Sequence, residues 1–341
     1  MPEIALTGIK PTGSPHLGNY LGMIRPALAL SRRFRAFYFI ADYHALTGRN
    51  DPHEIRRRTY EIAAAWIALG LDPQRVVLYR QSDVPEIFEF TWILQCVTPK
   101  GLLNRAHAYK AAVDANLAAG REPDADINAG VYSYPVLMAA DILICKAAVV
   151  PVGLDQKQHL EITRDIAAAF NRRFGDTLRQ PEAWIETSVE TIIGLDGRKM
   201  SKNYNNTIPI FADPDLIRRR VMAIVTDSRT VDAPKDPENC NVFSIYRHFA
   251  SSEQVEDMRR RYRQGAIGYG AAKEQLRQRL EETFGAARST YQELLTDRNR
   301  IDRILKRGAA RVRPIAAATL QIVREKIGAR LKASSRDANG P

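Results

Sequence analysis

The chain has 341 residues, 45% hydrophobic and 26% charged, which is ordinary for a globular protein of about two domains. Its net charge of +11 and pI near 9.6 favour a polyanionic partner. No apolar run approaches the ~20 residues of a membrane span, and three scattered cysteines form neither a disulfide framework nor a C-x-x-C metal site. We expect a protein of the reducing cytoplasm, without a secretion signal.

The first informative stretch is residues 3–24, EIALTGIKPTGSPHLGNYLGMI. It predicts a buried strand over 4–6, a turn rich in Gly, Pro and Thr over 7–15, and a helix over 20–30. This order commonly holds a nucleotide phosphate, because free backbone N–H groups and the helix dipole both favour an anion. The fingerprints G-x-x-x-x-G-K-[ST] and G-x-G-x-x-G are absent. His16, Gly18 and Asn19 stand at the helix start instead, and a satisfied turn is the alternative there.

Strands and helices then alternate, which predicts a doubly wound parallel sheet. Residues 36–41 and 76–79 predict strands, with a helix over 51–69 between them and another over 88–97. Asp42 and His44 follow the first of these strands. Ligands in open α/β sheets lie beyond the carboxyl ends of strands, so both residues either neighbour a site or cap the next segment.

A later helix, predicted over 134–144, is apolar except for Asp141. Tyr134, Met138 and Asp141 are spaced to share one face of it. A carboxylate buried among apolar side chains needs a donor, because an unpaired charge is costly to bury. The donor is either a group of the protein or one that arrives with a ligand, and the sequence leaves both open.

A strand over 147–153 runs into Gly153-Leu154-Asp155-Gln156, before a helix over 157–170. The glycine allows close backbone approach, and the two polar side chains suit ribose hydroxyls or an amine. Capping of the helix by Asp155 is the alternative.

The loop 196–206 holds Lys199 and Lys202 beside Gly197 and three Asn. Two lysines on a mobile loop suit closure over phosphates. A solvated basic loop or a hinge without phosphate explains the composition as well.

From Asp213 onward only helical periodicity remains, which predicts a separate helical domain over 213–332 and a disordered tail over 333–341. Residues 301–332 carry nine Lys or Arg against two acidic residues, a net charge of +7. This segment is either a solvated helix face or a surface for a polyanion.

Four motifs, GIKPTGSPHLGNY, SYPVLMAADIL, VPVGLDQKQH and GRKMSKNYNN, make residues 3 to about 330 resemble the bacterial tryptophanyl-tRNA synthetases of class I. The resemblance implies a Rossmann-like catalytic domain over 1–212 and an all-helical anticodon-binding domain over 213–332. It also implies ATP-dependent attachment of L-tryptophan to tRNA(Trp) through tryptophanyl-adenylate, with release of pyrophosphate and AMP. ATP as substrate, Mg²⁺ as cofactor and a cytoplasmic homodimer without a membrane partner follow from the same resemblance.

The resemblance also assigns residues to the site. The catalytic residues it implies are His16, Asn19, Lys199 and Lys202. Those it implies for ATP binding are Lys10, Pro11, Thr12, Gly18, Asn19, Gly153, Leu154, Asp155, Ile192, Lys199, Met200, Ser201, Lys202 and Asn203. Those it implies for tryptophan are Tyr134, Met138, Asp141 and Gln156, with Asp141 accepting the indole N–H. It names no protein ligand for a metal.

Two positions depart from the family pattern. Asn203 stands where the motif usually has Ser, and Lys10 where many members have Gln. Met138 replaces the Gln of the tyrosine enzymes and gives an apolar wall better matched to indole. The alternatives are a tyrosine enzyme, a small nucleotidylyltransferase and a non-catalytic RNA-binding paralogue. The last predicts damage to His16 or to the motif lysines, which is not seen.

Overall fold

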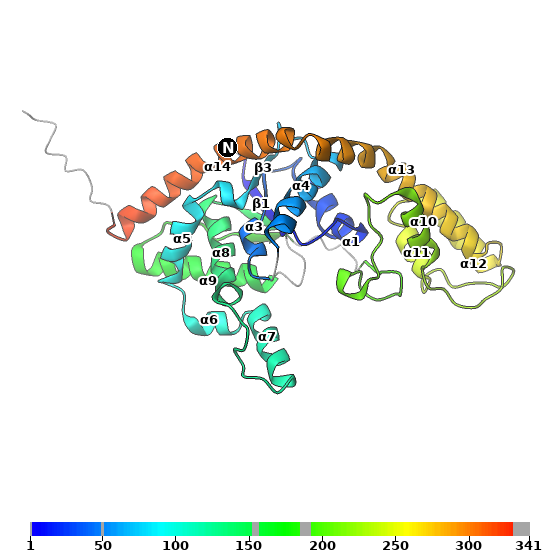
Figure 1. Ribbon diagram of the computed structural model, residues 1–341, viewed down its shortest axis with the longest axis horizontal. Coiled ribbons are helices and arrows are strands. Elements are labelled where there is room, and N and C mark those ends of the chain that lie inside the picture. Colours follow the sequence, from blue (N-terminus) through cyan, green and yellow to red (C-terminus); the bar gives the residue numbers. More distant parts are fainter. Residues whose placement is uncertain (1, 49–50, 152–156, 185–191, 330–341) are drawn as a thin grey trace, which may run out of the picture.

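The computed structural model describes residues 2–48, 51–151, 157–184 and 192–329 (Figure 1). Within them, five parallel strands form one sheet in the order β3-β2-β1-β4-β5. The strands are β1 (Ile4–Ile9), β2 (Arg35–Ile40), β3 (Val77–Arg80), β4 (Val149–Pro151) and β5 (Glu182–Trp184). The predicted doubly wound parallel sheet is therefore confirmed.

Strand β1 lies at the centre of the sheet. It pairs with β2 from Ile4 opposite Arg35 to Ile9 opposite Ile40, and with β4 through Ala5 opposite Val149. The strand order reverses between β1 and β4, which makes this the switch point of the sheet, where α/β proteins bind ligands beyond the strand ends. The turn that follows β1 therefore begins at the edge where a ligand is expected.

Helices cover both faces of the sheet, and alternate strand residues face opposite cores. Ala36, Tyr38 and Ile40 of β2 are buried in one cluster, while Phe37 and Phe39 are buried in the other. The helices of this part of the chain are α1 (Leu17–Asn19), α2 (Arg25–Leu30), α3 (Asp42–Ala45), α4 (Pro52–Ala68), α5 (Glu86–Gln95), α6 (Lys100–Asn104), α7 (His107–Ala118), α8 (Ala129–Ile144) and α9 (Lys157–Phe174). A π-helical turn (Tyr20–Ile24) joins α1 to α2.

Helix α8 begins earlier than the sequence suggests. Asn128 caps it by accepting the N–H of Val131, and Pro135 lies inside the helix rather than in its first turn. Most of the apolar run after Pro135 is buried, and Asp141 is buried with it.

The remaining helices are α10 (Pro214–Met222), α11 (Asn241–Tyr246), α12 (Ser252–Gln264), α13 (Tyr269–Thr296) and α14 (Arg298–Lys326). In Figure 1, α13 and α14 form a long arc, with α10 to α12 gathered at the far end of α13. Helix α14 returns to the sheet and packs on β3, where a Cβ on Gly308 would lie 1.9 Å from the Leu78 carbonyl oxygen. The division at 212/213 stays a prediction. None of the described helices is long and apolar enough to cross a membrane.

Candidate functional site

The first and the last of the four motifs lie against each other in the structure. The N–H of Leu17 donates to the carbonyl of Ile208 at 3.0 Å, and the N–H of Ile210 to the carbonyl of Pro15 at 3.3 Å. The N–H of Gly18 donates to Met200 Sδ at 3.2 Å. The start of the first helix and the loop that carries Lys199 and Lys202 therefore lie side by side.

His16 precedes α1 and is 7% exposed. Its backbone N–H donates to Asn19 Oδ1 at 3.1 Å, while its Nδ1 is buried without a partner in the described part of the chain. Burial, and then the positive charge of Lys202, lower the pKa of His16 to about 4. At neutral pH the imidazole is uncharged, so it can donate a hydrogen bond to a phosphate but adds no charge.

Lys202 reaches the turn that follows β1. Its Nζ donates to the carbonyl of Thr12 at 3.2 Å, and Gly13 beside it has φ of 120°, which favours glycine. Burial of the ammonium group, and then the charge of Arg58, lower the pKa of Lys202 to about 8. Two cations held this close together suit an anionic ligand.

Lys10 is the first residue after β1, at the start of this turn, and donates from Nζ to Thr47 Oγ1 at 2.9 Å. Burial lowers its pKa. Pro11 beside it is buried and Thr12 is exposed. The extra charge that the sequence places at position 10 therefore lies next to the turn that Lys202 contacts.

Asn206 holds the lysine loop in shape, and sequence reasoning missed it. Its Oδ1 accepts the N–H of Ser201 at 2.8 Å, and its Nδ2 donates to Asp196 Oδ1 at 2.7 Å and to the carbonyl of Lys199 at 3.2 Å. The side chain is 2% exposed. One buried amide therefore joins both ends of the segment that carries the motif lysines.

The predicted ATP residues of this loop divide into buried and exposed groups. Ile192 is buried and its carbonyl accepts the N–H of Met200 at 2.8 Å. Ser201 Oγ accepts the N–H of Asn203 at 3.3 Å and so caps a 3₁₀ turn (Lys202–Tyr204). Asn203 and Lys199 are exposed. Gly153, Leu154, Asp155 and Gln156 lie outside the described residues.

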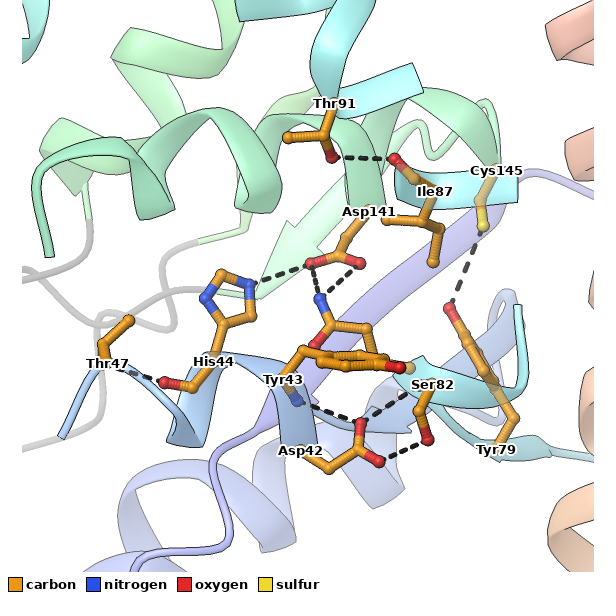
Figure 2. Close-up of polar contacts among 11 residues, drawn as sticks. Asp42, Tyr43, His44, Thr47, Tyr79, Ser82, Ile87, Thr91, Asp141 and Cys145 are labelled. Atoms are coloured by element: carbon orange, nitrogen blue, oxygen red, sulfur yellow. Dashed lines mark hydrogen bonds and ion pairs between the residues drawn. The ribbon is translucent and has the colours of Figure 1, made fainter. Parts of the chain in front are cut away.

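The carboxylate of Asp141 is 1% exposed and already has donors from the protein (Figure 2). Gln81 Nε2 lies 2.9 Å from Oδ1 and 2.8 Å from Oδ2, and His44 Nε2 lies 3.1 Å from Oδ2. Burial raises the pKa of Asp141, and the hydrogen bonds from His44 and Gln81 oppose that rise. The sequence left open whether the protein or a ligand supplies a donor to Asp141, and these donors belong to the protein.

Tyr134 and Met138 lie on the same helix as Asp141, as predicted. The Tyr134 hydroxyl is hydrogen-bonded to the His159 ring, and its own ring meets that of His44 edge-on, with centroids 6.2 Å apart. Met138 is half-buried against the core cluster that contains α5 and α8. The three residues thus border one partly apolar region that ends at a buried carboxylate.

Asp42, at the start of α3, forms hydrogen bonds in a neighbouring network and none with Asp141 among the described contacts. Its carboxylate accepts the N–H groups of Tyr43 and Ser82, each at 3.1 Å, and the Ser82 hydroxyl at 2.5 Å (Figure 2). Of the two polar residues that follow β2, His44 is the one that reaches Asp141. Among the described residues, no group of three or more His, Cys, Asp or Glu side chains could hold a metal ion.

The family described as tRNA synthetases class I (W and Y) matches residues 2–285. The tryptophan–tRNA ligase of Pseudomonas aeruginosa is 53% identical over 330 residues, which cover 95% of this chain and 73% of that protein. The chain belongs to the tryptophan–tRNA ligases. The ligase of Xanthomonas campestris pv. campestris is 48% identical and the match covers all of this chain and 80% of that protein.

Solved structures of the family agree. The tryptophanyl-tRNA synthetase of Campylobacter jejuni, complexed with ADP and tryptophan, has a TM-score of 0.88 and 42% identity, over 95% of this chain and 99% of that one. The tyrosyl-tRNA synthetase of Archaeoglobus fulgidus has a TM-score of 0.64 but only 18% identity, so it shares the fold alone. The tyrosine alternative that the sequence left open is therefore not supported.

Proposed function

We infer that this chain attaches L-tryptophan to tRNA(Trp) in two steps that consume ATP. The observation that carries the inference is the meeting of His16 and Lys202 at one turn, in a chain about half identical to tryptophan–tRNA ligases. A member of this family at 42% identity is complexed with ADP and tryptophan, which supports a site for both substrates.

In the first step, a carboxylate oxygen of tryptophan attacks the α-phosphorus of ATP. A bond forms between the carboxylate oxygen and the α-phosphorus. The bond from the α-phosphorus to the oxygen that bridges it to the β-phosphorus breaks, and pyrophosphate leaves with the electron pair of that bond. The carboxylate is already an anion, so no general base is needed. The chain contributes positioning and charge: uncharged His16 donates a hydrogen bond, and Lys199 and Lys202 stabilise the departing pyrophosphate. Asn19 shapes the turn by accepting the His16 N–H.

Mg²⁺ fits this site only as a companion of the nucleotide. Among the described residues, no group of three or more His, Cys, Asp or Glu side chains could hold the ion, whereas the phosphate oxygens of the nucleotide are ligands that Mg²⁺ prefers. When bound in this way, the ion neutralises phosphate charge.

Tryptophan is held through its indole N–H by Asp141. A carboxylate offers about four acceptor positions, and Gln81 and His44 leave room for one more donor. Tyr134 and Met138 provide the apolar walls, and we assign the amino group to Gln156. The tRNA acceptor end receives the tryptophanyl group in the second step, with AMP as the leaving group.

The helical region 213–332 is our candidate for the tRNA surface, and the sheet region 1–212 for catalysis. Basic side chains on α14 contribute phosphate contacts, which make binding depend strongly on salt. Arg303, Lys306 and Arg307 lie on this helix. A cytoplasmic location follows from this role in protein synthesis.

An apolar patch on α3 and α5 supports a homodimer. The rings of Tyr43 and Phe88 meet edge-on with centroids 4.5 Å apart, Trp92 one turn along α5 is 68% exposed, and Leu46 is 58% exposed. Large exposed apolar side chains grouped in this way mark an interaction surface. We assign this patch to contact with a second copy of the chain.

Exchange of labelled pyrophosphate into ATP, measured with each of the twenty amino acids, tests the function. We expect exchange with tryptophan alone. Exchange with tyrosine would keep the mechanism and overturn the choice of amino acid. Absence of exchange with all twenty, from protein that binds tRNA, would favour the non-catalytic paralogue.

A further inference from the structure

Arg58 of α4 points at the turn that follows β1, and no motif of the sequence includes it. A Cβ placed on Gly13 would lie 2.8 Å from Arg58 Nη1 and 2.6 Å from Lys202 Nζ. The two cationic groups therefore approach the same point from two different elements, one from α4 and one from the lysine loop. Gly13 leaves that point empty of side-chain atoms.

The guanidinium of Arg58 is only partly committed to protein partners. Its Nη2 donates to Glu54 Oε2 at 2.9 Å, one turn earlier on the same helix. Its Nε is buried and has no hydrogen-bond partner in the part of the chain that the structure describes. One edge is thus held by Glu54, while Nε remains unpaired and Nη1 lies beside Gly13.

The charges around Arg58 leave a positive excess at this point. Glu54 is shared with Arg57, whose Nη2 lies 3.0 Å from Glu54 Oε1. Glu61, which also faces this region, is paired with Arg57 Nη1 at 3.0 Å. The two carboxylates are therefore shared between Arg57 and Arg58. Lys202 has no ion pair of its own among the described residues.

We propose that Arg58 is a further phosphate-binding residue of this ligase, whose guanidinium contacts the β- and γ-phosphates of ATP and the departing pyrophosphate beside Lys202. The proposal rests on the proposed function, because it takes the ligand from that reaction. An arginine suits this role, since its fork of N–H groups can bind two phosphate oxygens at once. Glu54 orients the fork, and Gly13 allows the phosphates to approach.

The test is the binding of ligands that differ only in their phosphates. We expect Arg58→Ala to weaken ATP and pyrophosphate binding by about tenfold or more, the usual effect of losing a charged hydrogen bond. Binding of AMP and of tryptophan should change by less than about twofold, because neither ligand carries the β- and γ-phosphates. Isothermal titration of each ligand measures these constants.

Arg57→Ala is the matched control. It removes the neighbouring charge on the same helix and breaks pairs with the same Glu54, but its side chain is 54% exposed. We expect all four affinities to stay within about twofold of those of the unmodified chain. Arg58→Lys should recover part of the pyrophosphate affinity, because it restores the charge without the fork.

Equal losses for AMP and ATP in Arg58→Ala would show that Arg58 only supports the turn, and unchanged pyrophosphate binding would show that it is a surface partner of Glu54. Either result overturns the proposal. Thermal unfolding of each variant excludes loss of the fold. If the unmodified chain bound pyrophosphate through Arg58 but exchanged it into ATP with no amino acid, the proposed function would fail while this contact stood.

Discussion

The backbone N–H of Gly18 donates to the sulfur of Met200, 182 residues later in the chain, across 3.2 Å. This contact joins the helix start to the lysine loop, because Met200 is buried and lies directly between Lys199 and Ser201. Gly18 therefore contacts both motifs, and a substitution at Gly18 should displace the phosphate-binding groups of each.

Gly18→Ala should lower the rate of adenylate formation by about tenfold or more with little change in stability, since misplacing a catalytic group costs far more in rate than in folding. A Cβ at this position would lie 3.0 Å from Nδ1 and Cε1 of His16 and would push the imidazole aside. Pyrophosphate exchange and thermal unfolding measure the two effects. Gly22→Ala is the control, because a Cβ on Gly22 meets no atom within 4 Å; an equal loss there would contradict the argument.

Asn206→Asp should slow adenylate formation by about tenfold while tryptophan affinity stays unchanged, because the motif lysines lose their fixed positions. The hydrogen bond from the Asn206 amide is the largest cause that lowers the pKa of Asp196, to about 2. A carboxylate at position 206 would repel Asp196 instead, and the loop would lose this attachment. Single-turnover kinetics and tryptophan titration separate the effects. Asn203→Ser, on the exposed side of the same loop, should leave both values near those of the unmodified chain.

The pH profile should show the titration of Lys202. Its pKa is about 8, so the ammonium loses its charge as the pH rises through this value, and kcat/KM for ATP should fall above about pH 8. Bound phosphates favour the charged form, so the corresponding fall in kcat should occur at higher pH. Lys202→Arg should abolish this fall in activity, because arginine stays charged. Arg58→Ala should move it upward, since the charge of Arg58 lowers this pKa; a downward move would be inconsistent with the geometry.

Asp141→Asn should raise the KM for tryptophan by about tenfold or more and leave the KM for ATP within about twofold, because a charged hydrogen bond to the indole is lost. Steady-state exchange kinetics provide both constants. Asp42→Asn is the control, since Asp42 is a neighbouring carboxylate whose contacts are with Ser82 and Tyr43. Loss of ATP and tryptophan binding together in Asp141→Asn would mean that Asp141 serves the fold alone.

Trp92→Glu should convert a dimer to a monomer at micromolar concentration, because a charge would have to be buried in the apolar patch. Sedimentation or light scattering gives the mass. Tyr204 is also an exposed aromatic residue, at 53%, but lies on the lysine loop, so Tyr204→Glu should leave the mass unchanged. A monomeric unmodified chain would remove the patch from consideration as a dimer surface.

Features that depend on residues close together in the sequence could be predicted. The apolar run 36–41 predicts β2, Asp51 and Pro52 predict the start of α4, and the spacing of Tyr134, Met138 and Asp141 predicts their shared side of α8. Strand β5 was not predicted, because it has three residues and two of them, Glu182 and Ala183, are exposed.

Contacts between distant residues were beyond such reasoning. The donors to Asp141 are 60 and 97 residues away, and Gln81 has no local feature that marks it apart from its place after β3. Arg58 lies in a run of three arginines, and the sequence alone does not tell which of the three faces Gly13. In the sequence Asn206 resembles any loop asparagine, and only the fold shows that it is buried and hydrogen-bonded to both ends of the lysine loop.

The packing of α14 on β3 has a consequence for biosynthesis. Val312, Ala316 and Val323 belong to the same buried cluster as Phe37 and Val77 of the sheet. A ribosome therefore has to deliver residues near position 320 before this face of the sheet is covered. Until then the edge strand and its apolar neighbours are exposed to water and to other nascent chains, so this core is completed only after α14 has been synthesised.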